Sequence, residues 1–403
     1  MDVKQGYKQT EAGVIPEEWD ARPLKGQVSI AHGFAFASPY FAGSGEFRLT
    51  TPGHFHEEGG FRDVGEKQKF YTGPVPSDYI LRPGDMIVAM TEQADGLLGS
   101  AAFIPNVTGY LHNQRLGRVQ ALTTDANLGY LFWVFNSASY RAKVRETAAG
   151  TKVKHTSPEK LLEISVRLPP EPEQRAIATA LSDVDALLDG LDWLIAKKRG
   201  LMQAVMQQLL TGHTRLPGFH GEWEVKPFDE VLVRLNAKAH QIQTSDYQAA
   251  GMYPVVDQGK EQVIGFSDIE EKCLRCPDGG VIVFGDHTCF LKFIDFDFLV
   301  GADGTQVLMG KAGQNTRFHA FQLQYRGVAP TGYNRHFKFL KEREFVAPPL
   351  PEQTAIAAAL SDMDAELTAL RARRDKTRAL KLAMMQELLT GKTRLVSEGA
   401  AHA

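Results

Sequence analysis

The stretch from Pro172 to Leu216 reads PEQRAIATALSDVDALLDGLDWLIAKKRGLMQAVMQQLLTGHTRL, and residues 351–395 repeat it as PEQTAIAAALSDMDAELTALRARRDKTRALKLAMMQELLTGKTRL. When the two copies are aligned without a gap, 27 of the 45 residue pairs are identical. The residues that precede each copy resemble one another only faintly. A duplicated chain that keeps its connecting segments alike while the rest diverges suggests one scaffold that carries two different recognition surfaces.

Both copies have the spacing of a helix that packs on a partner helix. In the first copy the apolar positions alternate steps of four and three residues, with Lys198 as the interruption. These positions are Ile177, Leu181, Val184, Leu188, Leu191, Ile195, Met202, Val205 and Leu209. The second copy repeats the stripe, and three polar residues break its middle: Arg374, Thr377 and Lys381.

The ends of the two copies support helices. Pro172 and Pro351 suit a first helical turn, and Gly212 and Gly391 suit a C-terminal stop. The pattern therefore predicts two helices of about 40 residues, each about 60 Å long. We expect them to pack as an antiparallel coiled coil that holds two domains apart; the alternative is that each stripe covers its neighbouring domain.

The composition is that of an ordinary globular protein, with 403 residues, 43% hydrophobic residues and 23% charged residues. No apolar run approaches the roughly 20 residues of a membrane-spanning helix, and the polar first ten residues lack a signal-peptide core. Three cysteines in this length suit a reducing compartment. These features predict a cytoplasmic protein.

The net charge of −3 does not indicate a nucleic-acid binder, but the distribution of charge is uneven. Residues 141–167 hold seven Lys and Arg against three acids, and residues 311–343 hold seven against one. The two basic stretches largely overlap under the offset between the copies. Since phosphate contacts need local positive charge, the matching positions favour a functional role over a solvated polar face.

The parts outside the repeats are predicted to be α+β. Short apolar runs broken by Gly, Pro and Asp indicate strands, for example at residues 85–90, 281–284 and 290–293. One helix is expected in each half, near Leu128 to Val144 and near Ala320. Each half opens with a proline turn that leads into a tryptophan, Trp19 or Trp223.

Signatures of catalysis are missing from the sequence. There is no phosphate-binding loop, no dinucleotide fingerprint and no methyltransferase motif of the Asn-Pro-Pro-aromatic type. Cys273, Cys276, His287 and Cys289 offer a set of zinc ligands. The competing interpretation is small buried cysteines with a loop histidine, and we favour it, predicting no metal.

The repeated Pro-x-x-Glu-Gln-x-x-Ile-Ala-x-x-Leu-Ser-x-x-Asp motif, at residues 170–185 and 349–364, resembles the specificity subunit of type I restriction–modification systems. The Ile-Pro-x-x-Trp opening and the two-half layout add to the resemblance. So do residues 284–288 and 301–304, which are similar to segments of that family's target recognition domains.

The resemblance implies two α+β target recognition domains, residues 1–171 and 213–350, separated by two helical spacer repeats, residues 172–212 and 351–403, with pseudo-two-fold symmetry. Each domain would read one part of a bipartite, asymmetric site in double-stranded DNA, and the helices would fix the spacer. Two methyltransferase subunits that use S-adenosylmethionine would dock on this chain and methylate adenine. Restriction motor–nuclease subunits, when present, would add ATP- and Mg-dependent translocation and cleavage, so no cofactor is expected in this chain.

Candidate DNA-contacting residues are those whose side chains suit base edges or phosphates in exposed loops. In the first half we select Asn113, Gln114, Arg115, Lys152, Lys154 and His155. In the second half we select His287, Thr288, Lys292, Asn334, Arg335 and His336.

Two other functions remain open at this point. The first is a self-contained nuclease or methyltransferase whose site is unrecognised, which cofactor-dependent turnover by the purified chain would support. The second is a scaffold for methyltransferase subunits that no longer reads DNA, which sequence-independent binding would support.

Overall fold

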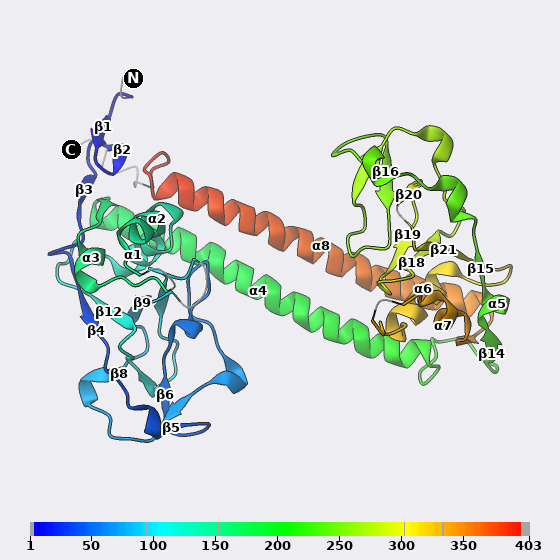
Figure 1. Cartoon of the computed structure of the whole chain (residues 1–403), viewed down its shortest axis with the longest axis horizontal. Helices are drawn as coiled ribbons and strands as arrows, with labels where there is room; N and C mark the ends of the chain where they lie inside the picture. The colour runs from blue at the N-terminus through cyan, green and yellow to red at the C-terminus, as the bar shows by residue number, and fades with distance from the viewer. Residues whose placement is uncertain (1–3, 93–95, 151–152, 302, 333, 396–403) are drawn as a thin grey trace. The chain divides into compact units, whose positions relative to one another are not determined.

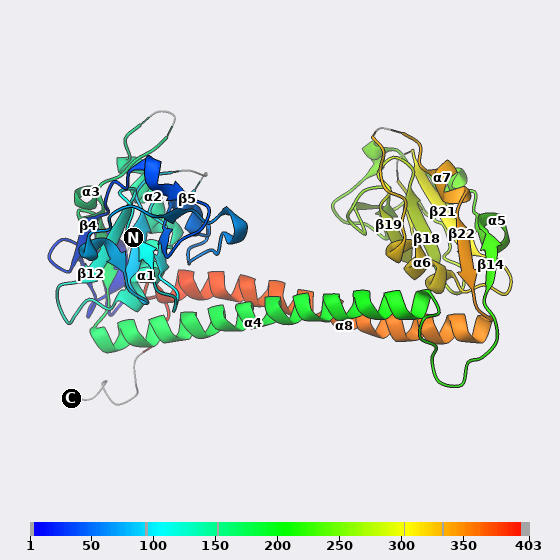
Figure 2. The same ribbon diagram turned by 90° about the horizontal axis from the view of Figure 1, so that it is seen from below.

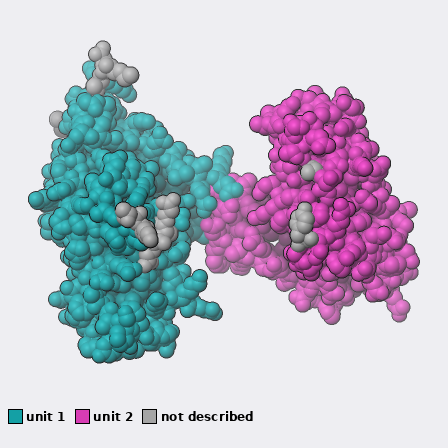
Figure 3. All heavy atoms as spheres, viewed as in Figure 1, with its two compact units in different colours: residues 1–190, 375–403 teal, residues 191–374 magenta. Residues whose placement is uncertain are grey.

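The computed structural model describes residues 4–92, 96–150, 153–301, 303–332 and 334–395. The chain divides into two compact units, shown in Figure 3. Unit 1 comprises residues 1–190 and 375–403, and unit 2 comprises residues 191–374. Helices α4 (Glu171–Leu210) and α8 (Leu350–Leu388), of 40 and 39 residues, therefore contribute to both units, and the predicted helix lengths are confirmed.

Unit 1 is built on a four-stranded sheet of order β10-β9-β12-β4 and a five-stranded sheet of order β5-β7-β6-β11-β8 (Figure 1). Two two-stranded ribbons, β1-β2 and β13-β3, complete its strands. The strands are β1 (Tyr7–Thr10), β2 (Gly13–Pro16), β3 (Asp20–Pro23), β4 (Val28–His32), β5 (Phe41–Ala42), β6 (Phe47–Leu49), β7 (Phe70–Tyr71), β8 (Ile80–Leu81), β9 (Met86–Ala89), β10 (Ala101–Phe103), β11 (Tyr110–Leu111), β12 (Leu116–Ala121) and β13 (Ser165–Leu168). Its short helices are α1 (Leu128–Phe135), α2 (Ala138–Thr147) and α3 (Pro158–Leu162).

Unit 2 has a four-stranded sheet of order β15-β21-β18-β19, a three-stranded sheet of order β17-β16-β20 and the ribbon β14-β22. The strands are β14 (Glu224–Pro227), β15 (Leu232–Arg234), β16 (Tyr253–Val256), β17 (Gly265–Ser267), β18 (Val281–Gly285), β19 (Leu291–Ile294), β20 (Leu299–Val300), β21 (Thr305–Gly310) and β22 (Glu344–Ala347). Its short helices are α5 (Phe228–Val231), α6 (Thr316–Tyr325) and α7 (Phe337–Lys341). Both units are thus α+β, as predicted.

One local prediction is wrong. The single helix expected from Leu128 to Val144 is two helices, because the side chain of Ser137 accepts a hydrogen bond from the Tyr140 amide and starts a second helix there. The expected strands at 85–90, 281–284 and 290–293 correspond to β9, β18 and β19. Among the described residues, no helix combines the length and the apolar content needed to span a membrane.

Within each unit, α4 and α8 run antiparallel, and Figure 2 shows this pairing from a second direction. In unit 1, Lys381 pairs with Asp185, and the apolar stripe of α4 packs with Leu388 and Leu389. In unit 2, Lys198 lies 2.8 Å from Glu366, and Arg374 lies 3.5 Å from Asp192. The charged residues that interrupt the stripes, Lys198, Arg374 and Lys381, thus form ion pairs between α4 and α8. The expected antiparallel packing is confirmed in both units.

Each long helix starts with the sequence Pro-Glu-Gln, and the glutamine of this sequence is buried and hydrogen-bonded through both its amide nitrogen and its oxygen. The Gln174 amide donates to Pro169 O at 2.8 Å, and its oxygen accepts from the backbone N–H of Asn127, which begins α1. Gln353 does the same with Pro348 O, at 2.7 Å, and with the N–H of Asn315 at the start of α6. Each glutamine therefore fixes a long helix to the short helix that packs on it.

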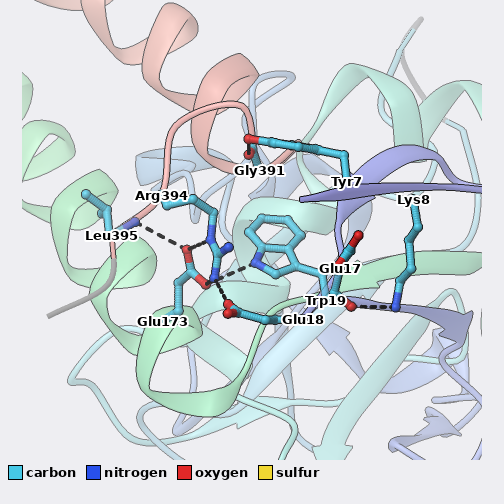
Figure 4. A network of polar contacts seen from close by, with 9 residues as sticks. All are labelled: Tyr7, Lys8, Glu17, Glu18, Trp19, Glu173, Gly391, Arg394 and Leu395. Carbon is cyan, nitrogen blue, oxygen red and sulfur yellow. Dashed lines mark hydrogen bonds and ion pairs between the residues drawn. The ribbon is translucent and has the colours of Figure 1, made fainter. Parts of the chain in front are cut away.

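The buried glutamate of the same motif holds the end of α8 on the start of unit 1 (Figure 4). The Glu173 carboxylate, 3% exposed, accepts from Arg394 Nε at 2.7 Å and Nη2 at 2.9 Å. It also accepts from Trp19 Nε1 at 3.0 Å and from the Leu395 amide at 3.2 Å. The Tyr7 hydroxyl donates to Gly391 O at 3.0 Å. We call these five residues, Tyr7, Trp19, Glu173, Gly391 and Arg394, the terminal clasp.

Unit 2 contains the matching clasp at the end of α4. Glu352, 1% exposed, accepts from Arg215 Nε at 2.5 Å and from Trp223 Nε1 at 3.2 Å. The arginine of the first copy thus binds the glutamate of the second, and the arginine of the second binds the glutamate of the first. The two copies of the repeat therefore make equivalent contacts in the two units.

Candidate nucleic-acid interface

Two predicted residues of the second half, His287 and Thr288, contact Gln258, which follows β16. The Gln258 side-chain oxygen accepts from the His287 amide at 3.2 Å, and its Nε2 donates to Asp303 O at 2.9 Å. The Thr288 hydroxyl donates to Gln258 O at 2.5 Å. Gln258 therefore joins the loop after β16 to the β18–β19 turn and to the loop after β20.

A second connection fixes the loop before α7 to the β18–β19 turn. The Thr331 amide donates to His336 Nε2 at 2.9 Å, so the proton of this imidazole lies on Nδ1, which donates to Asp286 O at 3.0 Å. The Phe337 amide donates to the Asp286 carboxylate at 2.8 Å. This loop exposes Asn334 and Arg335 and holds them beside the turn that contains His287 and Thr288.

Two of the predicted DNA contacts must be corrected to supporting roles. His336 is 0% exposed and makes the connections just described. Lys292 is 8% exposed; its Nζ donates to Asp257 O at 2.9 Å and lies 3.5 Å from the Asp257 carboxylate. Burial lowers the pKa of Lys292. Both side chains hold loops in place and have almost no surface that could contact a ligand.

In unit 1, the residues between β11 and β12 lie against the loop that begins at Gly33. The Phe34 amide donates to His112 O at 2.8 Å, and the Gln114 amide donates to Phe34 O at 3.0 Å. A Cβ atom at Gly33 would lie 2.1 Å from Asn113 O, so only glycine fits there. Gln114 and Arg115 are exposed, and Asn113 is half-buried.

The other predicted loop of unit 1 meets the same region through residues 90–92. The Met90 amide donates to Arg115 O at 3.1 Å, and the Glu92 amide donates to Lys154 O at 3.0 Å. The Thr91 hydroxyl lies 3.3 Å from His155 Nδ1. Lys154 and His155 are exposed, whereas Lys152 lies outside the described residues. The two groups of predicted residues in unit 1 are therefore neighbours.

Several cations of the two basic stretches hold the fold together. Buried Arg141 donates to the carbonyls of Glu57 and Gly96, and Arg167 donates to Ala12 O at 2.9 Å. In unit 2, Arg317 pairs with Asp364 at 3.0 Å. Other side chains of these stretches also donate to backbone carbonyls: Lys143, Lys160 and Arg343. Charge counting could not distinguish such cations from exposed ones.

The three cysteines lie in different apolar clusters. Cys273 packs near Tyr253, Cys276 near Phe298, and Cys289 near Phe228. Across the residues that the structure describes, no three His, Cys, Asp or Glu side chains gather as a metal site. Burial raises the pKa of each thiol.

The sequence-based prediction missed Gln258 and Asp286, which connect the loops of the candidate interface in unit 2. Asp286 directly follows β18, and Gln258 lies two residues after the end of β16. Polar residues at strand ends were the available signal. Their role depends on contacts with loops 30 to 50 residues away, which no local pattern reveals.

Known proteins with similar sequences are specificity subunits. The type I restriction enzyme MjaVIII specificity subunit of Methanocaldococcus jannaschii is 24% identical over 222 residues, which are 53% of this chain and 50% of that protein. The EcoBI specificity subunit of Escherichia coli is 26% identical over 208 residues, 49% of this chain and 40% of that protein. The chain thus matches half or less of the length of these two relatives. A putative MjaX specificity subunit of M. jannaschii is 20% identical over 438 residues, which cover 97% of both proteins.

A solved structure shares the fold. The crystal structure of a type I restriction–modification S subunit from M. genitalium superposes with a TM-score of 0.68 at 14% identity, over 96% of this chain and 98% of that one. The family described as "Type I restriction modification DNA specificity domain" matches residues 16–192 and 220–377. The chain therefore belongs to the family of type I restriction–modification DNA specificity proteins.

Proposed function

We propose that this chain selects the DNA sequence on which a type I restriction–modification complex acts, with each unit reading one part of a split site. The observation that carries the proposal is the grouping of the residues chosen from the sequence. In each unit they lie in neighbouring loops, and most are exposed: Gln114, Arg115, Lys154, His155, Asn334 and Arg335. Arginine, glutamine and asparagine are the side chains that best distinguish base edges in the major groove.

The domain limits follow the same proposal. We assign target recognition to residues 1–171 and 213–350 and spacing to the helical repeats at 172–212 and 351–403. Since the two helices are antiparallel within each unit, a change in their length would alter the separation that the complex tolerates between its half-sites. Its place of action would be the cytoplasm, where host DNA lies.

We further propose that two methyltransferase subunits, which hold the S-adenosylmethionine, dock on the outer faces of α4 and α8. The support is the exposed apolar side chains on these helices. Trp193 of α4 is 64% exposed, and Leu382 of α8 is 61% exposed. Leu187, Leu201 and Leu380 of the same helices are exposed as well, and exposed apolar patches mark protein–protein contacts. Restriction subunits with ATP and Mg would join such a complex through their own contacts.

The first experiment is to co-express this chain with a type I methyltransferase subunit of its host and to map methylated adenines across the genome. Methylation confined to one split, asymmetric motif is expected. Methylation at the same motif in a strain without this chain would refute the proposal. A complex that assembles but methylates no defined motif would indicate a scaffold that does not read DNA.

A second experiment tests the spacing role. Four residues inserted into α4 before Leu209, with a matching insertion in α8, should lengthen each helix by about 6 Å. The mapped motif should keep both half-sites and gain one or two base pairs of spacer. A changed base in either half-site would show that the helices do not act as a spacer.

A further inference from the structure

The loop after β20 presents a carboxylate at the interface of unit 2. Asp303 is exposed, and its Oδ1 accepts from the side-chain amide of Gln241 at 3.0 Å. Its backbone oxygen accepts from Gln258 Nε2 at 2.9 Å. Both the backbone and the side chain of this residue are therefore held by glutamines from other loops.

The position of Asp303 is further set by its neighbour. The Asp286 amide donates to Gly304 O at 2.8 Å. Gly304 has a φ of +89°, and a Cβ atom there would lie 2.8 Å from the Gln258 side chain and 3.0 Å from that of His287. The carboxylate thus belongs to the same connected loops as His287 and Thr288.

A fixed carboxylate is an unexpected group on a surface proposed to approach DNA, because phosphates repel it. It can only accept hydrogen bonds when ionised. In the major groove, cytosine N4 and adenine N6 donate, whereas guanine O6 and thymine O4 only accept. A carboxylate placed against a guanine or thymine carbonyl would lose its hydration without gaining a hydrogen bond.

We propose that Asp303 determines the specificity of unit 2 at one position of its half-site by selecting a base that presents an amino group. Gln241 is its positioning residue, since it orients the carboxylate. The inference rests on the proposed function, because it requires that unit 2 read DNA. It assigns the selection against guanine and thymine to one side chain.

The test uses the full complex and a library of DNA duplexes randomised across both half-sites, from which bound sequences are selected and counted. Asp303→Asn keeps the shape of the side chain and adds a donor. It should reduce the preference for cytosine or adenine over guanine and thymine roughly tenfold at one position. The half-site read by unit 1 should stay the same. Gln241→Leu should relax the same position to a smaller extent.

Asp278→Asn is the matched control. Asp278 is also an exposed aspartate followed by a glycine in unit 2, but it lies in the turn before β18. The Asp278→Asn variant should leave the selected motif unchanged. Complex assembly, measured by size-exclusion chromatography, confirms that each variant is folded.

The outcomes separate the inference from the proposed function. An unchanged motif with both Asp303→Asn and Gln241→Leu overturns the inference and leaves the proposed function intact. Failure of the wild-type complex to select any motif overturns the proposed function itself. If Asp303→Asn does not assemble, the Gln241→Leu motif decides: relaxation at one position supports the role of Asp303, and no change refutes it.

Discussion

Replacing Arg394 by methionine should open the terminal clasp. Glu173 would keep only two donors, Trp19 Nε1 and the Leu395 amide, while remaining buried. Removal of one partner from a buried ion pair costs about 3 to 5 kcal/mol, and the two remaining donors place the expected loss near the lower end. Methionine keeps the length of the apolar stem and removes the guanidinium, whose Cζ lies 5.9 Å from the centroid of the Trp19 ring, so the change tests mainly the charge.

Hydrogen exchange measures this loss locally, because the two units need not unfold together. A loss of about 3 kcal/mol raises the exchange rates of protected amides roughly 100-fold. We expect this increase in β1 to β3, while amides of β14 in unit 2 stay unchanged as an internal reference. The double variant Glu173→Gln with Arg394→Met should recover most of the protection, because a neutral amide still accepts from Trp19.

Arg175→Met supplies the control, because Arg175 lies on α4, the helix that also carries Glu173. Arg175 pairs with Glu171 at 2.7 Å, but its side chain is 71% exposed. Such an exposed pair contributes little to stability, because water screens the two charges. If Arg394→Met changed exchange no more than Arg175→Met does, the argument that the buried carboxylate depends on its arginine would be wrong.

Three further predictions follow from other parts of the structure. Burial lowers the pKa of His112 and of His319 to about 4 from an ordinary 6.5, so the unfolded chain takes up these protons first as the pH falls. The free energy of unfolding should therefore decrease between about pH 6.5 and pH 4, by about 2 kcal/mol per histidine at pH 5. Thermal unfolding should give a lower melting temperature at pH 5.0 than at pH 7.5, and His319→Gln should reduce the difference between these two temperatures. Gly391→Ala should destabilise the protein more than Gly212→Ala. Both glycines have φ near +74°, which costs alanine about 1 kcal/mol, but only at Gly391 would the added methyl group lie 2.5 Å from Pro16. Equal melting temperatures of the two variants would contradict this prediction. If Arg335 contacts a phosphate, Arg335→Met should reduce the steepness of log affinity against log salt concentration by about 0.9. Lys292→Met should leave this slope unchanged. A less steep slope with Lys292→Met would show that this lysine reaches the DNA.

The sequence predicted the helices well because their pattern is local. Alternating steps of four and three residues, a first-turn proline and a terminal glycine set the bounds of α4 and α8 to within three residues. The polar interruptions at Arg374 and Lys381 could not be interpreted from the sequence, since each depends on an acid 182 or 196 positions away. The role of a charged residue can be assigned only when its ion-pair partner is known, and the tertiary structure determines that partner.

The candidate interface was predicted less completely, for the same reason. Loop position and side-chain type were enough to select Arg115, Asn334 and Arg335, which are exposed. They did not reveal that Lys292 and His336 are buried, because the burial of each depends on contacts with residues 35 and 50 positions away. The structure separates the residues available to a ligand from those that hold the loops.

The terminal clasp also has a consequence for synthesis on the ribosome. Unit 1 includes residues 375–395, which are translated after every residue of unit 2. In unit 2, Glu352 can pair with Arg215 as soon as the start of α8 has been synthesised. In unit 1, Glu173 can pair with Arg394 only after almost the whole chain has been synthesised. The first part of the chain to emerge is therefore the last to be completed, and a chain that stops before Arg394 leaves Glu173 without its arginine.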